Sequence, residues 1–194
     1  MKVSERMNAL LPESVSPFER AQAKIVSNTS IVTGSAMLAL VLYWIVTNTF
    51  EDIETIFVLA ILLIILTGII ALVQRGYIKL GAWLLTGLML LLNLSNMTWY
   101  GIGNVASAGY IIPILLAVFA IGSKEGFGVT ILGCLSAFLI SYLASIGQLT
   151  TEIPYQESNL SFDAPTLSLI YLIVSILAGG WVNSTKEAFV DKNN

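Results

Sequence analysis

Histidine is absent from this 194-residue chain, cysteine occurs once, and charged residues make up only 11% of the sequence. Without histidine there is no His-ligated haem, no His-based metal site and no imidazole acid–base chemistry. A single cysteine excludes a disulfide framework and a Cys/His zinc site. The net charge of −3 gives no general attraction to phosphate backbones, so nucleic acid is not an expected partner. We expect no metal and no other cofactor.

Hydrophobic residues are abundant instead, at 56% of the sequence, and the mean hydropathy is +0.85. Soluble domains carry about 25% charged residues because their exterior needs polar groups to face water. The composition therefore excludes an ordinary soluble enzyme and a disordered tail. It predicts a polytopic membrane protein whose lipid-facing surface is apolar.

Six apolar segments approach the length of about 20 residues that a helix needs to cross a bilayer. Their apolar runs are long and unbroken rather than alternating, so we expect helices rather than strands. The sequence thus predicts an all-α fold, a bundle of six transmembrane helices. The expected spans cover residues 31–50, 53–73, 77–99, 105–121, 127–149 and 166–182.

The few basic residues all lie on one side of the predicted membrane domain. All nine basic residues lie before the first span, in or beside the second and fourth connections, or after the last span, and none lies in the connections after the first, third or fifth span. The positive-inside rule therefore places both termini in the cytoplasm, as expected for a multi-pass protein of a bacterial inner membrane. The basic residues are Lys2, Arg6, Arg20, Lys24, Arg75, Lys79, Lys124, Lys186 and Lys192.

The sequence divides into three parts. Residues 1–30 form a cytoplasmic arm, in which Ser16, Pro17 and Glu19 are typical of a capping box that starts a short amphipathic helix. Residues 31–182 form the six-helix transmembrane domain. Residues 183–194 are the cytoplasmic start of a signalling helix, with Lys186 and Phe189 on the output side.

Catalysis and ion transport are not expected, because no charge falls deep inside a predicted span. Proton pumps, voltage sensors and ion-coupled transporters depend on such buried ionisable groups. The chain also has no carboxylate pair, no Ser/His arrangement and no phosphate-cradling glycine loop, so we do not expect an enzyme.

Polar amides and aromatic side chains gather in the outer halves of the later spans. They have the composition of a small-ligand site, which would take a small apolar or aromatic molecule. The alternative is that the amides bond between helices and the tyrosines lie in the interfacial belt. The candidate ligand-binding residues are Asn93, Asn96, Trp99, Tyr100, Tyr110, Tyr142 and Tyr171.

Small residues recur every four positions in the fifth span, at Gly133, Ala137, Ser141 and Ser145. This spacing places them on one helix face, where small side chains let two helix backbones approach closely. We expect a packing seam there, either within the bundle or between protomers.

Several stretches resemble the six-helix N-terminal input modules of bacterial sensor histidine kinases and of nucleotide or diguanylate cyclases. These are residues 74–83 (QRGYIKLGAW), 108–113 (AGYIIP), 120–126 (AIGSKEG) and the arm at 19–24 (ERAQAK). The resemblance covers about residues 19–187. It implies a homodimeric sensor that detects an external or membrane-borne signal and drives a cytoplasmic kinase or cyclase domain. No such output domain lies within these 194 residues.

Two other functions remain open from the sequence. Six helices, this length and cytoplasmic termini also fit the substrate-binding subunit of a vitamin transporter, whose docking residues would include Ser35 and Ala39. The plain aliphatic second span fits a structural subunit of a larger membrane complex.

Overall fold

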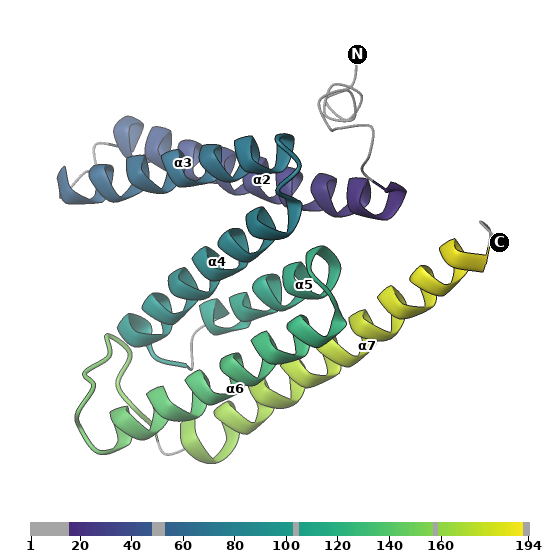
Figure 1. Cartoon of the computed structure of the whole chain (residues 1–194). Helices are drawn as coiled ribbons and strands as arrows, with labels where there is room; N and C mark the ends of the chain where they lie inside the picture. Colours follow the sequence, from purple (N-terminus) through teal and green to yellow (C-terminus); the bar gives the residue numbers. More distant parts are fainter. Residues whose placement is uncertain (1–15, 48–52, 103–104, 157–158, 192–194) are drawn as a thin grey trace. The chain divides into compact units, whose positions relative to one another are not determined.

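The computed structural model describes residues 16–47, 53–102, 105–156 and 159–191, and every regular element in these ranges is helical (Figure 1). The expected all-α class is therefore confirmed. In chain order the elements are α2 (Pro17–Thr47), α3 (Ile53–Gln74), α4 (Ile78–Tyr100), η1 (Val105–Tyr110), α5 (Ile111–Ala120), α6 (Ser123–Ser145), η2 (Asn159–Asp163) and α7 (Ala164–Asp191).

Five of these helices are long and apolar enough to cross a membrane. They coincide with five of the six predicted spans to within a few residues, apart from extensions at the start of α2 and at the end of α7. The chain therefore has the helices of a multi-pass membrane protein.

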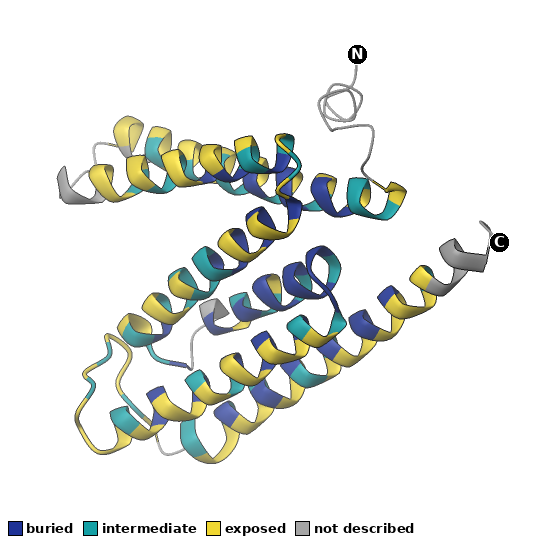
Figure 2. Ribbon diagram, in the orientation of Figure 1, coloured by how far each residue is buried: buried dark blue, intermediate teal, exposed yellow. Residues whose placement is uncertain are grey.

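The expected fourth span, residues 105–121, is shorter than predicted. It consists of the 3₁₀ turn η1 and the ten-residue helix α5, and its apolar helical part runs only over Ser107–Ala120. Six of the ten residues of α5 are buried, and the helix is mostly dark blue in Figure 2. Because neighbouring helices shield it, α5 does not need the full length of a lipid-facing helix.

The helix predicted at the start of the chain begins where the capping box indicated. The backbone N–H of Glu19 donates to Oγ of Ser16 (3.2 Å), and both the N–H and the hydroxyl of Ser16 donate to Oε2 of Glu19. The helix does not end at residue 30, however. It continues as the 31-residue α2, about 46 Å long. Residues 1–15 of the expected arm lie outside the described residues.

The chain forms two compact units that divide inside α4, at residues 85 and 86. The N-terminal unit contains the hairpin of α2 and α3 and the first turns of α4. Its core is small and lies at the end of the hairpin nearest the α3–α4 turn, where Ala23, Val26, Ile69, Val73 and Ile78 are buried. The remaining apolar side chains of this hairpin are largely exposed (Figure 2).

The C-terminal unit contains the rest of α4, the short η1–α5 segment, and the long pair α6 and α7. Helices α5, α6 and α7 contact one another, so each helix buries a face against the other two. Gly126 marks the closest approach of α6 to α5, because a Cβ at this position would lie 3.0 Å from the backbone of Val118. The absence of a side chain at Gly126 therefore sets the α5–α6 spacing.

Candidate ligand site and signalling helix

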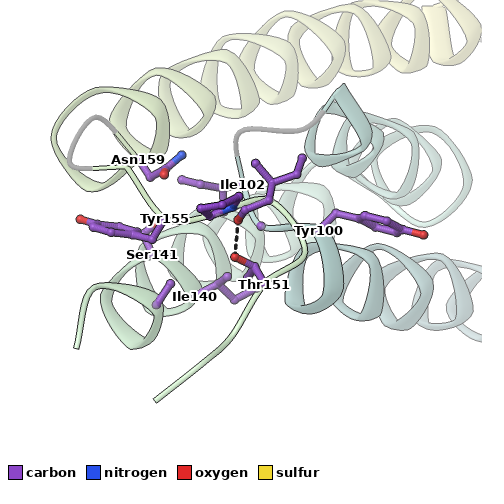
Figure 3. Close-up of a pocket in the computed structure, with 11 residues that line it drawn as sticks. Tyr100, Ile102, Ile140, Ser141, Thr151, Tyr155 and Asn159 are labelled. Carbon is purple, nitrogen blue, oxygen red and sulfur yellow. Dashed lines mark hydrogen bonds between the residues drawn. The ribbon is translucent and has the colours of Figure 1, made fainter. Parts of the chain in front are cut away.

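A small hollow lies in the C-terminal unit where the ends of α4 and α6 meet the 146–156 connection (Figure 3). Its cavity volume is about 20 Å³, which is room for a single ordered water. The residues around it include two of the predicted seam and ligand positions, Ser141 and Tyr100, and four others: Ile102, Thr151, Tyr155 and Asn159.

Backbone groups hold this hollow in place. The N–H of Glu152 donates to the carbonyl of Trp99 (2.8 Å), which fixes the connection against the end of α4. The hydroxyl of Thr151 donates to the carbonyl of Ile153, the dashed line in Figure 3. Gly101 turns the chain out of α4 with a φ of +77°, a conformation that favours glycine. Backbone amides, carbonyls and hydroxyl groups thus surround the hollow, and none of its lining residues is charged.

Two of the predicted aromatic residues meet inside the unit. The rings of Tyr110 and Tyr171 are tilted at 32° with their centroids 5.8 Å apart, and both side chains are fully buried. The Tyr171 hydroxyl donates to the carbonyl of Ser107, which ties α7 to η1. Gly133 of α6 makes room for the pair, because a Cβ there would lie 3.0 Å from the Tyr110 ring.

Asn93 of α4 lies against Gly109, the residue before Tyr110 in the chain. Its Oδ1 occupies the space above Gly109, where a Cβ would lie only 2.3 Å from the oxygen. Its Nδ2 donates to the carbonyl of Met89 in its own helix (2.8 Å). Asn93 thus brings α4 against η1 next to Tyr110, while the Tyr110–Tyr171 contact links η1 to α7.

The other candidates lie elsewhere. Trp99 and Tyr142 are exposed, at 65% and 54%, so their rings face the surroundings of the protein. Tyr100 lines the hollow, and Asn96 is half-buried in α4. The structure thus brings two of the seven predicted ligand residues, Tyr110 and Tyr171, into direct contact, and a ligand-binding role for the set stays a prediction.

The small-residue ladder of α6 faces the interior of the C-terminal unit for most of its length. Gly133, Ala137 and Ser141 are buried, and the Ser141 hydroxyl donates to the carbonyl of Ala137 (2.8 Å). Ser145 is exposed and its hydroxyl donates to the carbonyl of Tyr142, so it lies outside the seam.

Sequence reasoning missed the regular seam along α7. Apart from Gly179, its buried residues recur at alternating steps of four and three, which is the spacing of a heptad repeat. Small or hydroxylated residues at these positions, within an otherwise aliphatic helix, are the sequence signal that could have revealed the seam. The seam consists of Ala164, Ser168, Tyr171, Ser175, Ala178 and Val182.

A second feature that sequence reasoning missed is a hydrogen bond that connects the C-terminal part of α7 to the start of α6. The hydroxyl of Ser123, the first residue of α6, donates to Oδ1 of Asn183 (2.8 Å) and lies 3.4 Å from the carbonyl of Gly179. The predicted output residue Lys186 is exposed three residues further on. The side chain of Phe189 lies outside the described part of the chain.

The site offers hydrogen bonds and aromatic surfaces rather than metal chemistry. No group of three His, Cys, Asp or Glu residues that could hold a metal ion occurs among the described residues. The thiol of Cys134 is half-buried and donates to the carbonyl of Ser168 at 3.7 Å, a further contact between α6 and α7.

Searches of protein-family models, curated proteins and solved structures find no match to this chain.

Proposed function

We propose that the chain is a membrane sensory input module in which α7 carries the signal to the cytoplasm. The observation that carries this proposal is the heptad spacing of the buried residues of α7, from Ala164 to Val182. The register continues by spacing alone to Thr185 and Phe189, so the face that packs in the bundle is the face that would enter a coiled coil.

The small side chains of the seam would allow α7 to shift slightly against α5 and α6. Alanine and serine side chains interlock less deeply than leucine, so two positions of α7 against α5 and α6 can differ little in energy. A signal favours one position only if it binds the two states with different affinity. The Tyr110–Tyr171 contact lies in the middle of this seam and the Ser123–Asn183 hydrogen bond lies just beyond its C-terminal end, and both would change with any shift of α7.

The arrangement within each unit supports cytoplasmic termini in a bacterial inner membrane. In the N-terminal unit one groove is lined by Glu19 of the basic α2 start and by Lys79 of the α3–α4 turn, so these basic segments share one end. In the C-terminal unit the Ser123–Asn183 bond brings Lys124 and Lys186 to one end. This sorting is the one that the positive-inside rule requires.

The signal we propose is a small apolar or aromatic ligand, or a change in the membrane, acting at the outer end of the C-terminal unit. The hollow beside Tyr100 has room for one water, while Trp99 and Tyr142 present aromatic surface outward. This arrangement favours a signal that approaches from the lipid. The active form is a homodimer joined to a kinase or cyclase output domain.

The proposal is tested by fusing the full chain, after Asn194, to a diguanylate cyclase domain and inserting two or seven alanines directly after Lys186. Seven residues restore the heptad register, whereas two rotate the output by about 200° in a helix of 3.5 residues per turn. We expect the seven-residue insertion to keep the parent activity and the two-residue insertion to change it several-fold. Equal activity for both insertions would contradict a role for α7 in transmission.

A matched pair of variants tests the fastening of α7. Ser123→Ala removes the bond to Asn183 and is expected to shift the basal output of the fusion. Ser145→Ala removes a hydroxyl that bonds only within α6 at the exposed end, and it should leave the output unchanged. A shift of the same size in both variants would show that the Ser123 bond has no special role.

The N-terminal unit favours a second candidate, a structural subunit of a membrane complex. Only 17% of the span in α3 is buried, which leaves most of its apolar surface for other subunits. Ser35 and Ala39 of α2, the docking positions of the vitamin-transporter alternative, are also exposed. If this candidate is right, none of the fusion variants changes output, and the purified chain runs as part of a larger complex after mild solubilisation.

A further inference from the structure

An open groove lies in the N-terminal unit between the first turns of α2 and the α3–α4 turn. Its volume is about 480 Å³, within the range of about 300–1,000 Å³ that small-molecule sites occupy. Polar groups and a cavity coincide here. Its polar lining comes from Glu19 and Gln22 of α2 and from Tyr77 and Lys79 around the start of α4.

The start of α4 presents hydrogen-bond donors to this groove. The first backbone bond into the helix runs from the N–H of Gly81 to the carbonyl of Tyr77 (3.0 Å), so the N–H groups of residues 78–80 precede it. Tyr77 has no short side-chain oxygen to cap them. The positive end of the α4 dipole and the ammonium group of Lys79 therefore favour an anion on this side.

Gln22 is the independent sign of a ligand. Its side chain is only 4% exposed, yet it lines the groove and forms no hydrogen bond within the described part of the chain. The amide atoms are not among the fully enclosed polar atoms that lack a partner, so they face the groove, where a bound molecule can reach them. The amide is satisfied if a ligand in the groove supplies oxygen atoms for it.

Glu19 rules out a simple anion as the best ligand. Its Oε2 accepts both hydrogen bonds from Ser16, which hold the carboxylate at the α2 side of the groove. A lone phosphate would be repelled by this carboxylate and attracted by the α4 start. A zwitterion, with an anionic and a cationic group, complements both sides.

The groove lies at the end of the unit that carries Arg20, Lys24 and Arg75, which is the level of the cytoplasmic headgroups if the positive-inside rule holds. Tyr77 is 60% exposed at its rim, and Leu80 is 50% exposed beside it. An aromatic and an apolar side chain next to a polar groove suit a lipid whose headgroup enters the groove while its acyl chains lie outside.

We propose that this groove binds the phosphoethanolamine headgroup of a membrane phospholipid. The phosphate lies against the N–H groups at the start of α4 and against Lys79, and the primary ammonium group lies against Glu19. The Gln22 amide donates to the remaining phosphate or glycerol oxygens. This binding site is independent of the proposed signalling role of α7.

The test is a lipid titration of the full chain in detergent, followed by native mass spectrometry. We expect phosphatidylethanolamine to bind about tenfold tighter than phosphatidylcholine, whose methylated ammonium cannot donate a hydrogen bond, and tighter than phosphatidylglycerol, which has no cation. Equal affinity for the three lipids would overturn the proposal. Displacement of the lipid by equimolar water-soluble phosphoethanolamine would show that the ligand is a free metabolite and would overturn the lipid assignment.

Variants separate the two sides of the groove. Glu19→Gln should abolish the preference for ethanolamine over choline, whereas Lys79→Gln should weaken both lipids by about threefold. Gln22→Leu should weaken both by about tenfold. Lys124→Gln is the matched loss of one exposed lysine outside the groove and should change nothing. Unchanged lipid binding in Gln22→Leu or a retained preference in Glu19→Gln, with helical circular dichroism intact, would contradict the proposed contacts.

Discussion

Helices α3 and α5 are both almost entirely apolar, but the two units of the chain use them differently. Six of the ten residues of α5 are buried among its neighbours, whereas only 17% of the span in α3 is buried. In lipid an apolar side chain gains little by leaving the acyl chains for a protein neighbour. Apolar composition therefore decides that a helix enters the membrane, and other features decide what it packs against.

Small residues in the right register explain much of this difference. Gly126 brings α6 against the backbone of α5, and Gly133 makes room for the rings of Tyr110 and Tyr171. The corresponding residue of α3, Gly68, has no atom within 4 Å of the position that a Cβ would take. Gly126 and Gly133 thus allow close helix packing in the C-terminal unit, whereas the middle of α3 leaves most of its surface for lipid or a partner.

The largest expected effect is at the α5–α6 contact. In Gly126→Ala the new methyl group would lie 2.1 Å from Cγ2 of Val118 and 3.0 Å from its backbone, so a helix must move. We expect a loss of about 3 kcal/mol or more in stability, seen as a fall in thermal midpoint of about 6–12 °C in detergent. Gly128→Ala, in open space two residues on, should be neutral or slightly stabilising. Equal midpoints for the two variants would mean that this contact does not hold the unit together.

A smaller effect is expected at the equivalent contact of the N-terminal unit. In Gly81→Ala the added methyl group would lie 2.6 Å from Cγ2 of Val73, a side-chain atom, and 3.6 Å from the nearest backbone oxygen. A side chain gives way more easily than a backbone, so the cost should be about 1–2 kcal/mol. Gly68→Ala is the control in the same unit. A larger loss for Gly81→Ala than for Gly126→Ala would reverse the comparison between the units.

Removal of one hydroxyl inside the C-terminal unit should cost less again. Tyr171→Phe keeps the ring contact with Tyr110 and deletes the hydrogen bond to the Ser107 carbonyl. Interhelical hydrogen bonds in membrane proteins average about 0.6 kcal/mol, with a maximum of about 1.7. We expect a fall in midpoint of about 1–4 °C. Tyr142→Phe, whose ring is 54% exposed, should leave the midpoint within error.

The sequence was sufficient for the helices and insufficient for their partners. Long apolar runs separated by charged or glycine turns place each helix, because crossing a bilayer imposes a length on every lipid-facing segment. The buried helix α5 does not have to match the bilayer thickness, so the sequence pattern did not predict its short length. The sequence grouped Asn93 and Tyr100 in one candidate ligand site, but Asn93 lies against Gly109 while Tyr100 lines the hollow. Which residues meet across 64 positions, as Ser107 and Tyr171 do, depends on the packing of whole helices.

The smallest expected effect is at the start of α2, where the N-terminal unit is held by local bonds. Ser16→Ala removes the acceptor for the Glu19 N–H and the hydroxyl that binds the Glu19 carboxylate. Loss of a serine cap costs about 0.5–2 kcal/mol, but in a 31-residue helix this cost falls on the first turn alone. We expect faster amide hydrogen exchange at residues 17–21 and an unchanged thermal midpoint. Ser35→Ala, exposed in the middle of the same helix, is the control and should alter neither. A fall in midpoint for Ser16→Ala would show that the cap at the start of α2 stabilises the whole N-terminal unit. This unit would then depend on its helix cap as strongly as the C-terminal unit is expected to depend on Gly126.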